Sequence, residues 1–135
     1  FEEVLTIKEM IVKSQIPGYN LFLLDEIFKG TNTIERISAG KAVLSHLNSG
    51  SNIVFVSTHD IELADMLIDT YELYHFSEQV DNKTVDFDFK LKNGKLQNRN
   101  AIRILEINDY PKEIITEAIE LSEELGKIFV VKKTV

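Results

Sequence analysis

The apolar positions in the first half of the chain alternate between two patterns. Continuous apolar runs at 21–24 and 53–56 are typical of parallel strands that are buried on both faces. Apolar residues at helical spacing flank and separate these runs, over residues 2–14, 34–47 and 60–68. This order predicts an α/β fold in which two parallel strands are joined by a right-handed helical crossover.

The second half of the chain has sparser apolar positions. A strand is expected over 71–76, and the alternation over 85–91 predicts a half-buried strand that places Phe87 and Phe89 in the core. Residues 92–95 contain an Asn-Gly pair, which tolerates positive φ and therefore indicates a turn.

Two helices are predicted at the end of the chain. Asn98 or Asn100 can cap a short helix that ends at Ile107, and Pro111 suits the first turn of the next helix. The apolar positions of the second helix form one face: Ile114, Ala118, Leu121 and Leu125. Ile115 and Ile119 lie beside this face, so the apolar surface is wider than one small half-sheet needs. We therefore expect a helical hairpin over 98–135 that packs partly on its own sheet and serves as a dimerisation element. The alternative is that the sheet covers the whole apolar face.

Composition and charge narrow the class of protein. The 135 residues fit one domain or part of one, and the chain begins at Phe1 without Met, which suggests a piece of a longer protein. The net charge of −7 disfavours direct DNA binding by this segment, so DNA is expected to be contacted by the missing N-terminal part. No apolar run is long enough for a membrane span, and the absence of Cys is consistent with a cytoplasmic protein.

The first apolar run ends in the acidic pair Asp25-Glu26, a pattern like that of a Walker B strand. A parallel strand delivers Asp25 to the carboxyl edge of its sheet, where ligands of open α/β sheets bind. Asp25 can hold Mg²⁺ there through the water shell of the ion, and Glu26 can act as general base on an attacking water. By themselves, these two residues also fit an acidic pair that ends an ordinary strand.

The second apolar run ends in Thr58-His59. Because the carboxyl ends of parallel neighbours share one edge of a sheet, His59 is expected near Asp25 and Glu26. A histidine in that place can donate a hydrogen bond to a γ-phosphate. A solvent-facing loop histidine is the alternative.

A polar loop, 28–33, follows the acidic pair and opens the crossover helix. Gly30 permits a close backbone approach to a ligand. Asn32 and Glu35 have capping-box spacing, with Asn in place of the usual Ser or Thr, so the loop also has an ordinary capping role.

The segment 25–33, Asp-Glu-Ile-Phe-Lys-Gly-Thr-Asn-Thr, resembles the Asp-Glu-Ile-Gly-Arg-Gly-Thr-Ser-Thr segment of MutS-family ATPases. The Thr-His pair at 58–59 follows at the distance found in that family. Residues 1–3 resemble the stretch just after the family's signature serine, and residues 112–115 resemble the start of its C-terminal helix.

This resemblance implies an ABC-type ATPase with a P-loop NTPase sheet, ATP and Mg²⁺ as cofactors, a homodimer, and coupling of ATP turnover to DNA binding, mostly in mismatch repair. It also implies that Asp25 is the magnesium residue, Glu26 the general base and His59 the switch histidine. Gly30 and Thr31, within the matching segment, are the remaining expected cofactor-binding residues.

Two departures from the family pattern bear on function. Phe28-Lys29 replaces Gly-Arg, and the region 98–101 lacks the Ser-x-Ser-Tyr-Gly run of mismatch-repair members, which points to a MutS-related branch. The chain also has no Gly-x-x-x-x-Gly-Lys-[Ser/Thr] loop. Gly40-Lys41 lies inside a predicted helix, and we expect it to be an ordinary surface segment of that helix. Since the backbone of that loop cradles phosphates, the isolated chain is expected to be inactive as an ATPase.

The leading hypothesis is therefore a C-terminal ATPase fragment, with the ATPase part at 1–97 and the dimerisation element at 98–135. One alternative is an interaction module in which the sheet merely supports the hairpin. The other is a fragment of a different ABC-type ATPase of DNA metabolism.

Overall fold

The computed structural model describes residues 1–81, 84–97 and 100–133. The chain divides into two compact units, 1–74 with 93–95, and 75–92 with 96–135. The boundary expected between residues 97 and 98 stays a proposal, and Asn98 itself lies outside the described residues.

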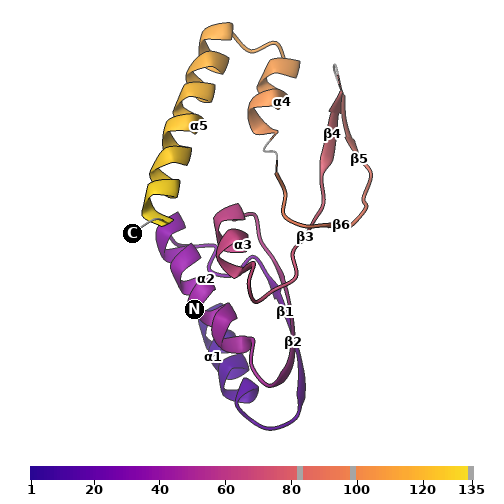
Figure 1. Cartoon of the computed structure of the whole chain (residues 1–135), viewed down its shortest axis with the longest axis vertical. Coiled ribbons are helices and arrows are strands. Elements are labelled where there is room, and N and C mark those ends of the chain that lie inside the picture. Colours follow the sequence, from indigo (N-terminus) through magenta and orange to yellow (C-terminus); the bar gives the residue numbers. More distant parts are fainter. Residues whose placement is uncertain (82–83, 98–99, 134–135) are drawn as a thin grey trace. The chain divides into compact units, whose positions relative to one another are not determined.

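The first unit is a three-helix, two-strand α/β arrangement (Figure 1). Its elements in chain order are α1 (Glu2–Ser14), β1 (Tyr19–Asp25), α2 (Thr33–Leu47), β2 (Ser51–Ser57) and α3 (Ile61–Leu67). The sequence predicted all of these elements to within a few residues, because their apolar patterns and end signals agree.

Strands β1 and β2 pair in parallel over their whole length, from Tyr19 opposite Ser51 to Asp25 opposite Ser57. The predicted parallel pairing with a helical crossover through α2 is confirmed. Both strands end at the same edge, so the loops that follow Asp25 and Ser57 lie side by side.

The core of this unit lies between the sheet and the helices. Phe22 and Leu24 of β1 point to this side and are buried. The helices and the first loop contribute the remaining buried apolar residues: Ile7, Ile27, Ile37, Leu44, Leu47, Leu63 and Leu67. At the opposite end of the strands, Asn20 donates to the Asn52 side-chain oxygen (2.9 Å).

Only one face of this sheet is covered, so the prediction of strands buried on both faces is wrong for this unit. Leu21 and Leu23 alternate with the buried β1 residues, and Leu23 is 66% exposed. In β2, Ile53 and Phe55 are also exposed. The helices α1 to α3 pack on the other face, and no other described element of this unit covers these side chains.

Strand β3 is shorter than expected. The prediction of a strand over 71–76 is confirmed only for Tyr74–His75, which pairs with β6 (Lys92–Asn93). Tyr71 instead completes the turn after α3, because its N–H donates to the Leu67 carbonyl (2.9 Å).

The second unit contains an antiparallel pair and two helices. Strands β4 (Glu78–Asp81) and β5 (Thr84–Phe87) pair from Glu78 opposite Phe87 to Asp81 opposite Thr84. Helices α4 (Ala101–Ile107) and α5 (Lys112–Lys133) follow.

The prediction of a half-buried strand over 85–91 fails in its second half. β5 ends at Phe87, and Phe89 has a left-handed backbone, with φ 53°. Phe89 is 84% exposed, and its ring contacts Phe87 at a centroid distance of 6.1 Å. The two rings therefore pack on each other in solvent, and the prediction that they form a core is wrong.

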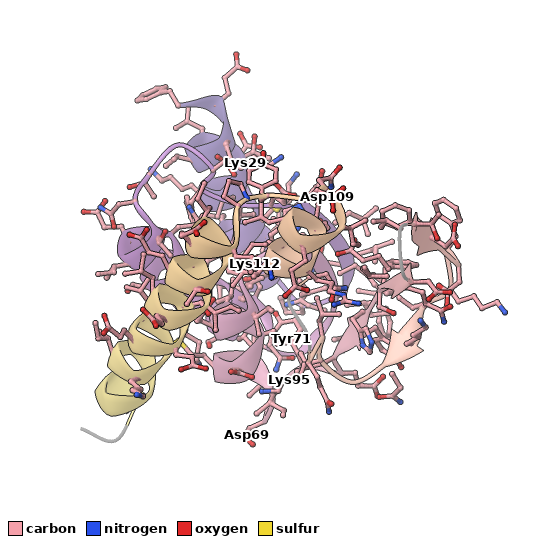
Figure 2. The ribbon with its side chains drawn as sticks, turned by 90° about the horizontal axis from the view of Figure 1, so that it is seen from above. Lys29, Asp69, Tyr71, Lys95, Asp109 and Lys112 are labelled. Carbon is pink, nitrogen blue, oxygen red and sulfur yellow. The ribbon has the colours of Figure 1, made fainter. Side chains whose placement is uncertain are left out.

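Helices α4 and α5 form the predicted hairpin (Figure 1). Asn100 occupies the N-cap position of α4 but makes no side-chain cap hydrogen bond. The connecting turn contains Asp109 (labelled in Figure 2), whose φ of 54° reverses the chain before Pro111. Throughout the described residues, no helix has the length and apolar character needed to cross a membrane.

Candidate functional site

The loops at the shared carboxyl edge of β1 and β2 bring together the acidic residues predicted for the site. Ser57 Oγ donates to Asp25 Oδ1 in a short hydrogen bond across the strand ends. The next residue, Glu26, continues the ladder, since its N–H donates to the Ser57 carbonyl (3.0 Å). The backbone position of Glu26 is therefore tied to β2 as well as to β1.

The Glu26 carboxylate lies between two nitrogen-bearing side chains. Its Oε1 is 2.5 Å from His59 Nε2, and its Oε2 is 2.8 Å from Lys29 Nζ. The expected proximity of His59 to Glu26 is thus present. The hydrogen bond to Glu26 raises the pKa of Lys29 (labelled in Figure 2), so the lysine is a cation under all ordinary conditions.

The loop after Glu26 has an unusual backbone. Both Glu26 (φ 46°) and Phe28 (φ 60°) adopt left-handed conformations that ordinary residues rarely take. The Phe28 N–H donates to Glu3 Oε1 of α1 (2.7 Å), and the Phe28 side chain packs against the core. In the MutS-family segment that this loop resembles, the position of Phe28 is a Gly, the residue suited to such a φ. Glu3 was missed by sequence reasoning because it lies 25 positions away.

Gly30 and Thr31 differ in what surrounds them. Nothing lies within 4 Å of a Cβ added to Gly30, so its backbone is open to a ligand. The Thr31 hydroxyl donates to Glu35 Oε2 (2.6 Å). The predicted cap on α2 is present, because Asn32 Oδ1 accepts from the Glu35 N–H (3.0 Å), while the Glu35 carboxylate binds Thr31.

An ion pair that the sequence did not reveal joins the two loops. Arg36 in the first turn of α2 binds the carboxylate of Asp60, which directly follows His59. The hydrogen bond to Asp60 raises the pKa of the Arg36 guanidinium above its ordinary value. The pair spans 24 positions, so no short-range pattern could have revealed it.

Asp25 and Ser57 place oxygen atoms side by side at this edge. Among the described residues, no group of three or more His, Cys, Asp or Glu side chains is placed to hold a metal ion. Mg²⁺ usually keeps several waters and takes one or two carboxylates together with substrate phosphates. The exposed carboxylate of Asp25, with the Ser57 hydroxyl beside it, fits that requirement.

Gly40-Lys41 lies inside α2, as predicted, but the expectation that it is a surface segment is wrong for Gly40. Gly40 is buried, and a Cβ added there would lie 3.2 Å from Leu63 Cδ2 of α3. Lys41 Nζ donates to Ser45 Oγ one turn away (2.6 Å). Neither residue belongs to a loop that could surround a phosphate.

Comparison with known proteins gives a consistent result. A family model described as MutS domain V matches residues 2–126. The MutS DNA mismatch repair protein of Shouchella clausii is 30% identical over 127 residues, covering 91% of this chain and 14% of that protein.

Two eukaryotic relatives give similar values. The DNA mismatch repair protein MSH3 of Saccharomyces cerevisiae is 31% identical over 116 residues, which cover 80% of this chain and 11% of that protein. The human MutS protein homolog 4 is 30% identical over 117 residues, which cover 80% of this chain and 12% of that protein. The chain thus spans only a small part of the length of these curated relatives.

Proposed function

Because the chain belongs to the MutS family, we propose that it is the C-terminal part of an ABC-type ATPase domain with a P-loop NTPase sheet. In the parent protein, this domain would couple ATP binding and hydrolysis to DNA binding. Residues 1–97 would be the ATPase part and residues 98–135 the dimerisation element.

One observation carries this proposal: Glu26 and His59 meet at the carboxyl ends of two parallel strands. This edge is where ligands of open α/β sheets bind. A carboxylate has about four lone-pair sites, so Glu26 can accept from a water while it still contacts His59 and Lys29. Glu26 would take the proton of that water as it attacks the γ-phosphate.

The neighbouring residues would bind the nucleotide and its metal ion. Asp25 would hold Mg²⁺ through water, and the ion would neutralise phosphate charge during hydrolysis. His59, whose side chain is 90% exposed, can turn to donate to the γ-phosphate. The open backbone at Gly30 and the hydroxyl of Thr31 would border the same ligand.

The rest of the active site would come from the parent protein. No residues in this chain form a phosphate-binding loop, so nucleotide binding requires the part that carries one. DNA would be contacted by other parts of the parent, in a protein that acts in the cytoplasm. Relatives named as DNA mismatch repair proteins support a role in that process or a related one.

Substitution of Glu26 by Gln in the full-length protein tests the proposal. Gln keeps the size of the side chain but cannot take a proton, so we expect ATP binding to persist while hydrolysis falls about 10²–10⁴-fold. Single-turnover hydrolysis measures the loss. Glu9→Gln, at an exposed position of α1, is the matched control and should leave the rate unchanged. A near-normal rate for Glu26→Gln would show that another residue activates the water.

A second function, interaction through the hairpin, is favoured by the surface of α5. Its exposed apolar side chains are Ile114, Ile119, Leu121, Leu125 and Ile128. Such a surface fits a dimer contact, and it is compatible with the ATPase role in the parent protein. The family match makes a different ABC-type ATPase the weaker reading.

A further inference from the structure

The pair formed by Arg36 and Asp60 has the geometry of a strong, specific interaction. Arg36 Nε lies 2.7 Å from Asp60 Oδ2, and Arg36 Nη2 lies 2.8 Å from Asp60 Oδ1. The side chains are only 24% and 14% exposed. Two parallel charge-assisted hydrogen bonds fix orientation as well as distance, and partial burial reduces screening by salt.

The Asp60 side chain does not cap the helix that it precedes. It occupies the N-cap position of α3, where an Asp side chain normally accepts from the first turn and contributes about 1 kcal/mol of stability. The Asp60 side chain makes no such cap hydrogen bond. Its carboxylate is directed across the loop to Arg36 instead.

The pair ties together both loops of the candidate site. Asp60 directly follows His59, and Arg36 also donates from Nη1 to the Thr31 carbonyl (3.4 Å). One guanidinium therefore holds the segment after β2 and the segment after β1. The His59 side chain is 90% exposed and contacts Glu26, so the backbone beside it has a large part in setting its position.

Packing between the two helices also involves apolar residues away from this pair. The contact of α2 with α3 is made by buried residues further along both helices, among them Gly40, Leu44, Leu63 and Leu67.

We propose that Arg36 is a positioning residue for hydrolysis: through Asp60 it holds His59 at Glu26, and through the Thr31 carbonyl it holds the loop that follows Glu26. This inference rests on the proposed ATPase function. It assigns a role to a residue that acts through Asp60 and Thr31, and it couples the movements of the two loops.

Steady-state hydrolysis by the full-length protein provides the first test. Because small displacements of catalytic groups are costly, Arg36→Ala should lower kcat about 10-fold while KM for ATP stays within about twofold. Arg36→Lys keeps the charge but not the two parallel hydrogen bonds, so its kcat should lie between those of the wild type and Arg36→Ala. Exchanging the charges, Arg36→Asp with Asp60→Arg, should recover part of the loss. Lys41→Ala removes a cation of the same helix that bonds only locally to Ser45, and should have no effect.

A double-mutant cycle with His59→Ala identifies the route of the effect. If Arg36 acts through His59, its substitution should lower kcat far less in the His59→Ala background than in the wild type. Independent, multiplying effects would overturn the route through Asp60 and His59. So would an Arg36→Ala protein with wild-type kcat.

Hydrogen–deuterium exchange of the same proteins tests the positioning role without relying on ATP hydrolysis. Arg36→Ala should speed exchange in residues 57–64 and leave β1 unchanged, whereas Lys41→Ala should change neither. Unchanged exchange in 57–64 overturns the positioning role whatever the ATPase rate. If the wild-type protein hydrolyses no ATP, the proposed function fails, and the catalytic part of this inference fails with it. If the wild-type protein hydrolyses ATP and Arg36→Ala does so at the same rate, only this inference fails.

Discussion

At the residue scale, Phe28 shows how one side chain can compensate for an unfavourable backbone. A left-handed conformation costs a residue with a Cβ about 1–2 kcal/mol, and Phe28 adopts it with φ 60°. The bond from its N–H to Glu3 and the packing of its ring on the core offset that cost. The loop beside Glu26 is therefore held by contacts with α1 rather than by the freedom of a glycine.

Tyr71 gives the first unit a defined response to alkaline pH. Its hydroxyl donates to the Leu44 carbonyl (2.7 Å), and burial raises the pKa of Tyr71 (labelled in Figure 2) to about 12. The pKa is higher in the folded than in the unfolded chain, so the stabilising effect is fully present below about pH 10 and is lost as pH rises toward about 12.

We therefore expect Tyr71→Phe to unfold more easily than wild type at pH 7, by about 1 kcal/mol, because the Leu44 carbonyl loses its partner. Between pH 10 and 12 the difference should shrink, because ionisation of Tyr71 then stabilises the unfolded state of the wild type and Phe has no such group. Urea unfolding of both proteins at pH 7 and at a pH between 10 and 12 measures the difference in the free energy of unfolding. Tyr110→Phe, at the exposed turn before α5, is the control. A difference that stays constant with pH would contradict the assigned cause.

The residues of the site differ in how far the sequence could reveal them. Asp25, Glu26 and His59 were placed at one edge because two apolar runs end in them, and the structure brings Glu26 and His59 together. Arg36 and Asp60 have no such signal, because their contact depends on how α2 and α3 pack. The catalytic roles themselves remain predictions.

At the element scale, local sequence patterns predicted the helices and the two parallel strands of the first unit. They did not predict which faces of the strands are covered. A continuous apolar run predicts a strand, but whether both faces are covered depends on elements outside the run. Leu23 and Phe55 are exposed for that reason. Phe89 shows a different failure, since alternation of polar and apolar residues cannot reveal a left-handed φ.

The contact of α2 with α3 depends on a glycine. An added Cβ at Gly40 would be 3.2 Å from Leu63 and 3.7 Å from Ile27, so the gain in helix propensity with Ala is opposed by crowding. Gly40→Val adds more atoms in the same space and should destabilise the chain by about 2 kcal/mol.

Gly126 of α5 provides the matched control for this prediction, because nothing lies within 4 Å of a Cβ added there. Gly126→Val should change the free energy of unfolding by less than about 0.5 kcal/mol. Denaturant unfolding followed by circular dichroism compares the two variants. Equal effects at Gly40 and Gly126 would show that α2 and α3 do not pack closely at this point.

At the scale of the whole molecule, the missing phosphate-binding loop limits what the chain can do alone. The sequence contains no phosphate-binding loop that could cradle a triphosphate. We expect the isolated chain to show no micromolar binding of Mg-ATP and no turnover. Isothermal titration calorimetry measures this, and a micromolar dissociation constant would contradict it.

The exposed apolar side chains of α5 lead us to predict that the chain self-associates. Ile119 of α5 is 39% exposed, and a glutamate at this position would carry a charge into any dimer contact made there. We expect the wild-type chain to associate as its concentration rises and Ile119→Glu to remain monomeric in analytical ultracentrifugation. Glu117→Gln changes one charge elsewhere on the helix surface and is the control. A wild-type monomer at high concentration, or a variant that associates equally well, would remove the dimerisation assignment.

The register of β1 on β2 has a consequence for how the chain folds. Every pair in this sheet joins residues 32 positions apart, as in Leu21 opposite Ile53. No short hairpin can therefore nucleate it, and the intervening segment must first be brought into a closed loop. The helices should form before the strands meet, and the apolar runs stay accessible to other chains during that interval. Slow strand pairing makes this segment prone to aggregation during synthesis and refolding, so its yield should improve at low concentration.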